Sequence, residues 1–334
     1  MNNADSLKTS KTIHGRVAAL LTAEERDAPD FWSTPESRVV YVPVEDGEIR
    51  VIHVRPQNPI AVRPIVLVPG WGSLPSGFGD FYSVIHQRAE LYYIETREKH
   101  TSRLDRKKAR LTMSRKAADI AEALNFLGLS GERDFVFLGT CWGGALIFQG
   151  LLDGTLHAPT LVTLDPMHKL WYPEWMLRYV APLLPVSVVQ LIKPFLKALA
   201  LAGMKERVQR RRAEDFIDSA EIWKWKRAAQ SVWDFELFGN LQNLREEVFV
   251  FNGTGDKIHD PLNYPRIAAE LPRGRFFFMP TEESRRERLM GLIALEFAKV
   301  TADQGVPAAL AMFEKILDRA SLTTAAGRRG SLKS

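Results

Sequence analysis

The ten residues 135–144 constrain the fold more than any other part of the chain. They begin with a short continuous apolar run, which is typical of a strand buried on both faces. Gly139 follows at once, and residues 143–152 have helical character. A strand, a sharp turn and a helix in this order place Cys141 on the turn, between Gly139 and Gly143, where the flanking glycines let neighbouring backbone come close. We therefore predict a nucleophile elbow, although most lone cysteines are small buried hydrophobes.

Seven other short runs have strand character. The first two surround Asp46 and Gly47 and predict a hairpin, and apolar residues at helical spacing follow over 112–128. The seven runs are 38–44, 49–54, 65–68, 91–94, 161–164, 247–251 and 275–278. Strands alternate with helices along most of the chain, so we predict an α/β fold with a mostly parallel eight-stranded sheet and helices on both faces.

Residues 167–240 interrupt this alternation, because they separate two strands by far more residues than a crossover helix needs. We predict that they form an inserted helical cap. The core then comprises residues 36–166 and 241–316. Residues 1–35 are expected to be a helical or loose leader, and residues 317–334 a tail.

The predicted cap is rich in aromatic and apolar residues. It holds five of the eight tryptophans, and its apolar stretch 180–201 is interrupted by Pro182, Pro185 and Pro194. Prolines disfavour one straight helix, so we expect short amphipathic helices over a pocket for an apolar ligand. The basic run 207–212 is expected to make a weak contact with a membrane surface. The alternative is that the aromatic residues form a small core of the cap and the arginines a solvated face.

The overall composition is that of an ordinary globular protein with a formal net charge of +5. The single cysteine cannot form an internal disulfide, and the polar N-terminus lacks an apolar run, so we expect no secretory signal and a cytoplasmic protein. Zinc-ligand spacing, nucleic-acid modules and a phosphate-loop motif are not found. We therefore expect no metal, no other cofactor and no nucleic-acid partner.

The run Gly139-Thr140-Cys141-Trp142-Gly143-Gly144 resembles the nucleophile elbow of the α/β-hydrolase superfamily, and the resemblance covers about 38–300. The cysteine makes it most similar to the elbows of dienelactone hydrolases and polyhydroxyalkanoate synthases, which use Cys, His and Asp. The cap looks more like those of the polymerase and lipase branches. The resemblance implies a hydrolase or acyltransferase.

The same resemblance implies an oxyanion hole and a catalytic acid. The backbone N–H groups of Trp142 and Trp71 are the expected oxyanion donors. Trp71 follows Pro69-Gly70, where the family usually has His-Gly. Asp256, in the loop after the strand 247–251, matches the acid, and Asp165 is a second possible acid.

The histidine expected after the last strand is missing, because residues 280–286 contain none. Three explanations remain open. His259 or His168 reaches the site, Cys141 works without a histidine with help from Glu282 or Glu283, or the domain has lost hydrolysis and kept a binding pocket.

These features lead to two hypotheses. The first is an enzyme acting on a small-molecule ester or thioester with an apolar acyl part, with Cys141, Asp256 and His259 as candidate catalytic residues. The second is a catalytically impaired binding protein of the same fold. The elbow favours the first hypothesis, and the missing histidine favours the second.

Overall fold

The sheet confirms the predicted α/β fold. A computed structural model describes residues 3–24, 26–131, 134–170, 174–204, 207–253, 260–319 and 321–322. All eight predicted runs form strands: β1 Ser37–Val44, β2 Gly47–Val54, β3 Ile65–Val68, β4 Leu91–Ile94, β6 Val136–Thr140, β7 Thr160–Leu164, β8 Val248–Asn252 and β9 Gly274–Phe278. Two further strands of two residues each, β5 Arg103–Leu104 and β10 Glu314–Lys315, are too short to produce a sequence pattern.

The strand order is β1-β2-β4-β3-β6-β7-β8-β9-β10, with β5 paired to β2. The pairs from β4 through β9 are parallel, and the pairs made by β1, β2, β5 and β10 are antiparallel. In the register, Gly139 of β6 lies beside Val68 of β3 and Thr163 of β7. The residues that follow these three strands therefore reach the same edge of the sheet, which is where ligands bind in open α/β sheets.

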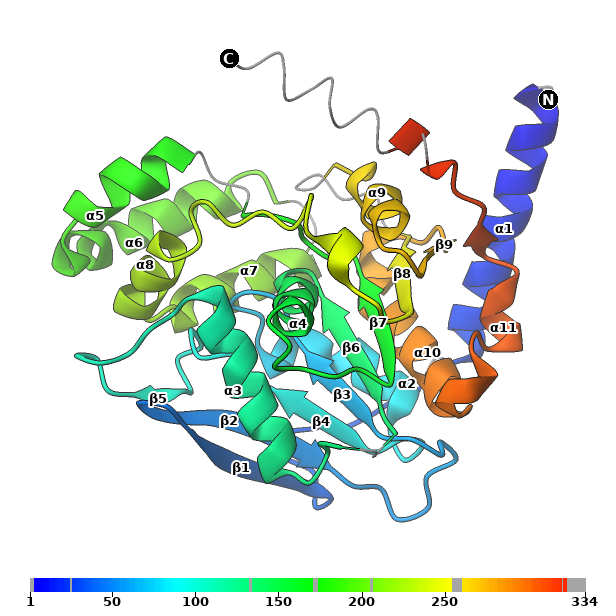
Figure 1. Ribbon diagram of the computed structural model, residues 1–334, viewed down its shortest axis with the longest axis horizontal. Coiled ribbons are helices and arrows are strands. Elements are labelled where there is room, and N and C mark those ends of the chain that lie inside the picture. Colours follow the sequence, from blue (N-terminus) through cyan, green and yellow to red (C-terminus); the bar gives the residue numbers. More distant parts are fainter. Residues whose placement is uncertain are drawn as a thin grey trace.

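Two layers of helices cover the sheet (Figure 1). One apolar cluster joins the sheet to α3 Met113–Phe126, α4 Trp142–Leu152 and α9 Asn263–Glu270. The other joins it to α1 Asn3–Ala23, α2 Gly79–Ile85, α10 Arg286–Ala298 and α11 Ala308–Ala311. In β3, Val66 and Val68 belong to the first cluster, and Ile65 and Leu67 to the second. This alternation explains why the strand is a continuous apolar run.

The insertion between β7 and β8 is helical, as predicted. It contains the π-helix η2 Met176–Val180 and the α-helices α5 Ala181–Leu183, α6 Val186–Leu201, α7 Arg207–Ser219 and α8 Ile222–Gln230. The chain bends by 112° between the segment Met176–Leu183 and α6, and Pro185 caps α6. The expectation that prolines divide this stretch is correct at Pro185 and wrong at Pro194, which lies inside α6.

The predicted leader contains α1, and Val17 and Leu21 of this helix are fully buried against the core. In Figure 1, α1 lies beside α11 on the side of the molecule away from the cap. The domain bounds taken from the sequence remain a prediction.

Candidate active site

Cys141 lies at the junction of β6 and α4 in a strained backbone conformation. Its φ of 52° and ψ of −120° place a non-glycine residue in a region that costs about 1–3 kcal/mol. The surrounding chain holds this conformation through two backbone hydrogen bonds. Cys141 N donates to Leu164 O at 3.2 Å, and Met167 N donates to Cys141 O at 3.1 Å. The half-buried cysteine also precedes the first turn of α4, whose positive end faces it.

Gly139 and Gly143 are required by close backbone contacts around this turn. A Cβ on Gly143 would lie 2.1 Å from the carbonyl oxygen of Val68. A Cβ on Gly139 would lie 2.7 Å from the Cα of Gly144. Both distances are far below van der Waals contact, so a side chain at either position would push the elbow away from β3 or from the start of α4.

The two expected oxyanion donors lie next to the elbow, since Trp142 follows Cys141 and Trp71 follows Gly70, which approaches Cys141. Trp142 is the first residue of α4, so its N–H has no acceptor within the helix. Trp71 lies in the tight turn closed by the Ser73 N to Gly70 O hydrogen bond of 3.2 Å. The indole rings of Trp71 and Trp142 pack edge to face at 5.7 Å between centroids. The structure therefore brings together Cys141 and both predicted donor residues.

A buried lysine that the sequence analysis did not single out lies beside the elbow. Lys99 follows β4, and its Nζ donates to Gly70 O at 2.6 Å. Gly70 lies against the cysteine, since a Cβ placed on it would be 3.5 Å from Cys141 Sγ. Burial of the ammonium lowers the pKa of Lys99 to about 8, and the carboxylate of Glu98 offsets part of this effect. Lys99 is thus a group that can be neutral near physiological pH.

A buried charged network holds the loop that carries Lys99. Glu98 lies 3.8 Å from Lys99 Nζ and 3.7 Å from Lys116 Nζ. Burial acts to raise the pKa of Glu98, but the two lysines together with hydrogen bonds to the carboxylate outweigh it and lower the pKa. Lys224 of the cap helix α8 donates to the carbonyl oxygens of Lys99 at 3.0 Å and Ser102 at 2.7 Å. The cap therefore fixes the backbone of the loop as well as covering it.

A second cation approaches the elbow from the segment after the last long strand. Arg286, the first residue of α10, donates from Nε to Asp165 Oδ2 at 2.7 Å and from Nη2 to Thr140 Oγ1 at 2.9 Å. Asn252 Nδ2 donates to the other oxygen of Asp165 at 2.7 Å. Burial acts to lower the pKa of Arg286, but the carboxylates of Asp165 and Glu287 together outweigh this effect and raise it. Asp165, the second possible acid, is therefore paired with an arginine.

The remaining predicted catalytic residues, Asp256 and His259, lie outside the residues that the structure describes. His168, the other histidine considered for the site, bonds through Nδ1 to Glu236 at 2.8 Å. Glu282 and Glu283 are both exposed. The segment 280–286 thus sends an arginine, rather than a histidine or a glutamate, toward Thr140.

Lys99 could be noted in the sequence as a residue that follows a predicted strand. Only the order of the strands shows that this strand ends at the same edge of the sheet as the elbow. Arg286 gave no such signal, since it lies in a run of four charged residues that looks like an ordinary solvated helix start.

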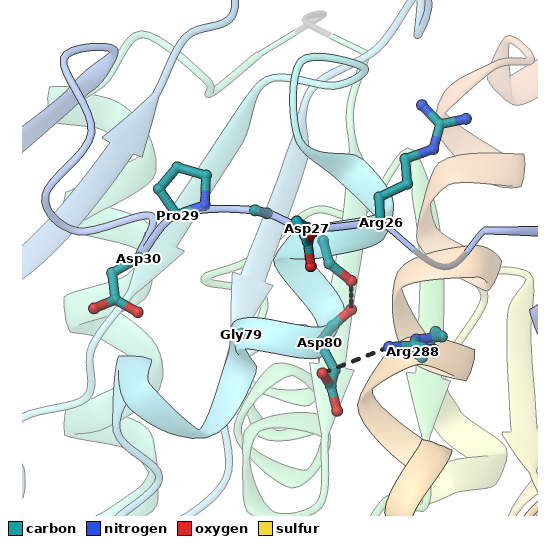
Figure 2. Close-up of a pocket in the computed structure, with 9 residues that line it drawn as sticks. Arg26, Asp27, Pro29, Asp30, Gly79, Asp80 and Arg288 are labelled. Atoms are coloured by element: carbon teal, nitrogen blue, oxygen red, sulfur yellow. Dashed lines mark hydrogen bonds and ion pairs between the residues drawn. The ribbon is translucent and has the colours of Figure 1, made fainter.

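A cavity of about 480 Å³ lies apart from these residues, between the segment 26–30, α2 and α10. Figure 2 shows that its wall is polar, with Asp80 directed toward Arg288 of α10, at 3.8 Å. None of the predicted catalytic residues lines it. Within the described part of the chain, no group of three or more His, Cys, Asp or Glu side chains could hold a metal ion.

Comparisons with known proteins match the chain to one protein family and to many solved structures of the same fold. The family model described as "Alpha/beta hydrolase family" matches residues 65–310. A search of curated proteins found no match. An esterase from Exiguobacterium antarcticum is similar at 12% identity, with 79% of this chain and 100% of that chain covered and a TM-score of 0.62. A hydrolase from Pseudomonas aeruginosa PA01 is similar at 17% identity, with 77% and 97% covered and a TM-score of 0.59. A thermophilic esterase from Thermogutta terrifontis is similar at 18% identity, with 75% and 93% covered and a TM-score of 0.58.

Proposed function

The chain belongs to the alpha/beta hydrolase family, and on that basis we propose that it is a hydrolase or acyltransferase that attacks an ester or thioester through Cys141. The observation that carries the proposal is the strained conformation of Cys141 at the start of α4, which packing of Gly143 against Val68 maintains. Strain of this kind is kept where function requires it. Two of the similar structures are esterases, which supports ester substrates. The resemblance to the cysteine elbows of dienelactone hydrolases and polyhydroxyalkanoate synthases supports a thiol nucleophile.

In the proposed reaction, the sulfur of Cys141 attacks the carbonyl carbon of the substrate as its thiol proton passes to a base. The carbonyl oxygen becomes an oxyanion that accepts hydrogen bonds from the N–H groups of Trp71 and Trp142. Collapse of this intermediate expels the alcohol or thiol, which takes the proton back from the base. The product is an acyl-enzyme thioester, and attack by water or by a second alcohol completes hydrolysis or transfer.

We assign the base role to Lys99 in its neutral form. Its Nζ reaches the turn that lies against Cys141, and its lowered pKa of about 8 makes the neutral amine available at moderate pH. Asp256 and His259 stay predictions, and His259 is the alternative base. Arg286, whose charge is compensated by Asp165, donates to Thr140 and so positions the end of β6 next to Cys141. An apolar acyl part remains the expected substrate feature, and no cofactor takes part in this scheme.

One observation favours the second candidate function, a binding protein without turnover. The segment in which the family carries its histidine instead provides Arg286, which is bonded to Asp165 and Thr140. In that case the site around Cys141 would bind an ester without cleaving it.

The deciding experiment compares wild type with Cys141→Ala and Cys141→Ser on p-nitrophenyl esters and acyl thioesters of increasing chain length. We expect turnover by wild type, weak residual turnover by the serine variant, and none by the alanine variant. Unfolding curves of the three proteins serve as the control for folding. Equal turnover by wild type and Cys141→Ala would overturn the proposal. Binding of the substrates without turnover by wild type would favour the second function.

A further inference from the structure

Helix α6 carries an apolar stripe on its exposed side. Six large apolar residues recur at helical spacing and are all exposed: Val188, Leu191, Ile192, Phe195, Leu196 and Leu199. Leu191 is 81% exposed, Phe195 70% and Leu199 66%. We call these six residues the α6 stripe. A surface helix normally turns such a stripe toward the core, so the α6 stripe is an apolar face that the described chain leaves uncovered.

The polar side chains of α6 show that this orientation is built in. Lys193 Nζ donates to the carbonyl oxygens of Asp218 at 2.9 Å and Ala220 at 3.2 Å. Lys197 Nζ pairs with the carboxylate of Asp218 at 2.6 Å. The helix is therefore attached to the rest of the cap through its two lysines and through Leu201, which is buried at its end. Leu191, Phe195 and Leu199 are mostly exposed, whereas an ordinary surface helix buries such residues.

The segment before α6 extends the apolar surface. Trp175, Tyr179 and Leu183 are well exposed, and α5 and α6 lie together at the edge of the molecule opposite α1 (Figure 1). Exposed tryptophan and tyrosine beside aliphatic residues are typical of surfaces that meet the headgroup region of a membrane.

The charged residues of this segment are all basic, and the nearby acidic residues are Glu174 before it and Glu214, Asp215 and Asp218 on α7. Residues 175–204 contain no aspartate or glutamate, and their charged residues are Arg178, Lys193 and Lys197. Arg210 and Arg211 on the adjoining α7 are exposed as well. An apolar helix face bordered by basic residues complements a surface that is anionic on the outside and apolar beneath.

We propose that the α6 stripe binds to the surface of an anionic phospholipid bilayer, with α6 lying in the plane of the membrane. In the described residues no single helix is long and apolar enough to cross a bilayer, and the helix pair that passes this test together is bent by 112°. The 16 residues of α6 span ~24 Å, less than the ~30 Å of a hydrocarbon core. These dimensions fit a helix that lies on the membrane better than one that spans it.

A second copy of the chain is a less suitable partner for the stripe. A two-fold interface places the same patch against itself, so the basic residues around α6 would meet their own copies. An anionic bilayer neutralises these charges instead. The proposal does not require catalysis, because none of the residues involved lies at the elbow.

The test is co-sedimentation of the full chain with vesicles of phosphatidylcholine and phosphatidylglycerol at 70:30, and with vesicles of phosphatidylcholine alone. We expect binding to the mixed vesicles, a decrease of tenfold or more without phosphatidylglycerol, and a similar decrease in high salt. The double variant Leu191→Ser/Phe195→Ser should lose at least tenfold in partitioning. The matched control, Ile60→Ser/Val62→Ser, removes two exposed apolar side chains outside the cap and should bind as wild type does.

Two results would overturn the proposal. One is equal partitioning of wild type and the stripe variant. The other is a stable dimer in analytical ultracentrifugation that the stripe variant converts to monomer, which would assign the stripe to a second copy. Cys141→Ala should bind vesicles as wild type does, so failure of the catalytic proposal would leave this result unchanged.

Discussion

The loop beneath the candidate site buries charged side chains, whereas helix α6 exposes apolar ones. Beneath the site, four charged side chains are almost completely buried: Arg97, Lys99, Lys116 and Asp119. On α6, leucine, isoleucine, valine and phenylalanine side chains are exposed, and two lysines together with the buried Leu201 attach the helix to the protein. Buried charge and exposed apolar surface are both unfavourable for folding alone. Exceptions to local folding rules tend to mark functional or strained sites, and these two exceptions lie in the regions where we place catalysis and membrane binding.

The two exceptions should respond differently to mutation. The buried charges are held by partners within the chain, so removing one partner should disturb both the fold and the reaction. Leu191, Phe195 and Leu199 of the α6 stripe are mostly exposed, so changing them should disturb neither.

The largest effect is expected for Lys99→Met. Loss of a base should slow acylation by about 10²–10⁴-fold, which is about 3–5 kcal/mol of barrier. Because the base must be neutral, the wild-type acylation rate should rise with pH through about 8 and then level off. Stopped-flow release of p-nitrophenol measures this profile, and the inflection near pH 8 should be absent in the variant.

His259→Ala is the matched comparison for that experiment. If Lys99 is the base, this variant should keep the inflection and most of the rate. Loss of the inflection in His259→Ala, with its retention in Lys99→Met, would transfer the role to the histidine.

The next largest effect is expected on stability, from the buried ion pair of Arg97 and Asp119. Arg97 Nη2 donates to Asp119 Oδ1 at 2.6 Å, and both side chains are buried. Asp119→Asn would leave a buried arginine without its main countercharge, so we expect a loss of about 3–5 kcal/mol in the free energy of unfolding. The exposed pair Arg103–Glu48 is the control, since Glu48→Gln should change it by less than about 1 kcal/mol. Urea unfolding compares the two, and equal effects would contradict the distinction.

A smaller effect is expected from packing at the elbow. Gly143→Ala places a methyl group 2.1 Å from Val68 O and should cost about 1–3 kcal/mol or more in stability. It should also lower activity more than stability alone explains, because the turn carrying Cys141 must shift. Gly203→Ala in the cap is the control, because a Cβ there meets nothing within 4 Å. Thermal unfolding and initial rates of both variants test the difference.

The smallest effect is expected on α6. Phe195→Ser should change the free energy of unfolding by less than about 0.5 kcal/mol, because the side chain is largely exposed. Phe137→Ala in β6, which is fully buried, should cost about 3–5 kcal/mol. Chemical denaturation measures both, and a large loss in Phe195→Ser would mean that the stripe packs against part of the chain.

The sequence predicted the sheet well because its central strands are buried on both faces and therefore read as continuous apolar runs, as in 65–68 and 161–164. The elbow was predictable for a related reason, since Gly139 and Gly143 mark the close approach of backbone on both sides of Cys141. Gly143 acts within the turn itself, so its position two residues after Cys141 can be recognised in the sequence.

The surroundings of the elbow were less predictable, because they depend on which strand ends meet. Lys99 and Arg286 are separated from Cys141 by 42 and 145 residues in the sequence, and only the strand order brings them to one edge of the sheet. The orientation of α6 was also missed. Its spacing predicted an amphipathic helix correctly, but the sequence does not say which face points outward, and the lysine contacts with Asp218 decide this.

If Cys141 carries the acyl group, the mass of the cysteine-bearing peptide must show it. The protein is mixed with a p-nitrophenyl acyl ester, quenched in acid within the first turnover and digested at low pH. We expect one added acyl group on the peptide that contains Cys141, formed in step with one equivalent of p-nitrophenol. Release of p-nitrophenol with an unmodified Cys141 peptide, or with the acyl group on another residue, would contradict it.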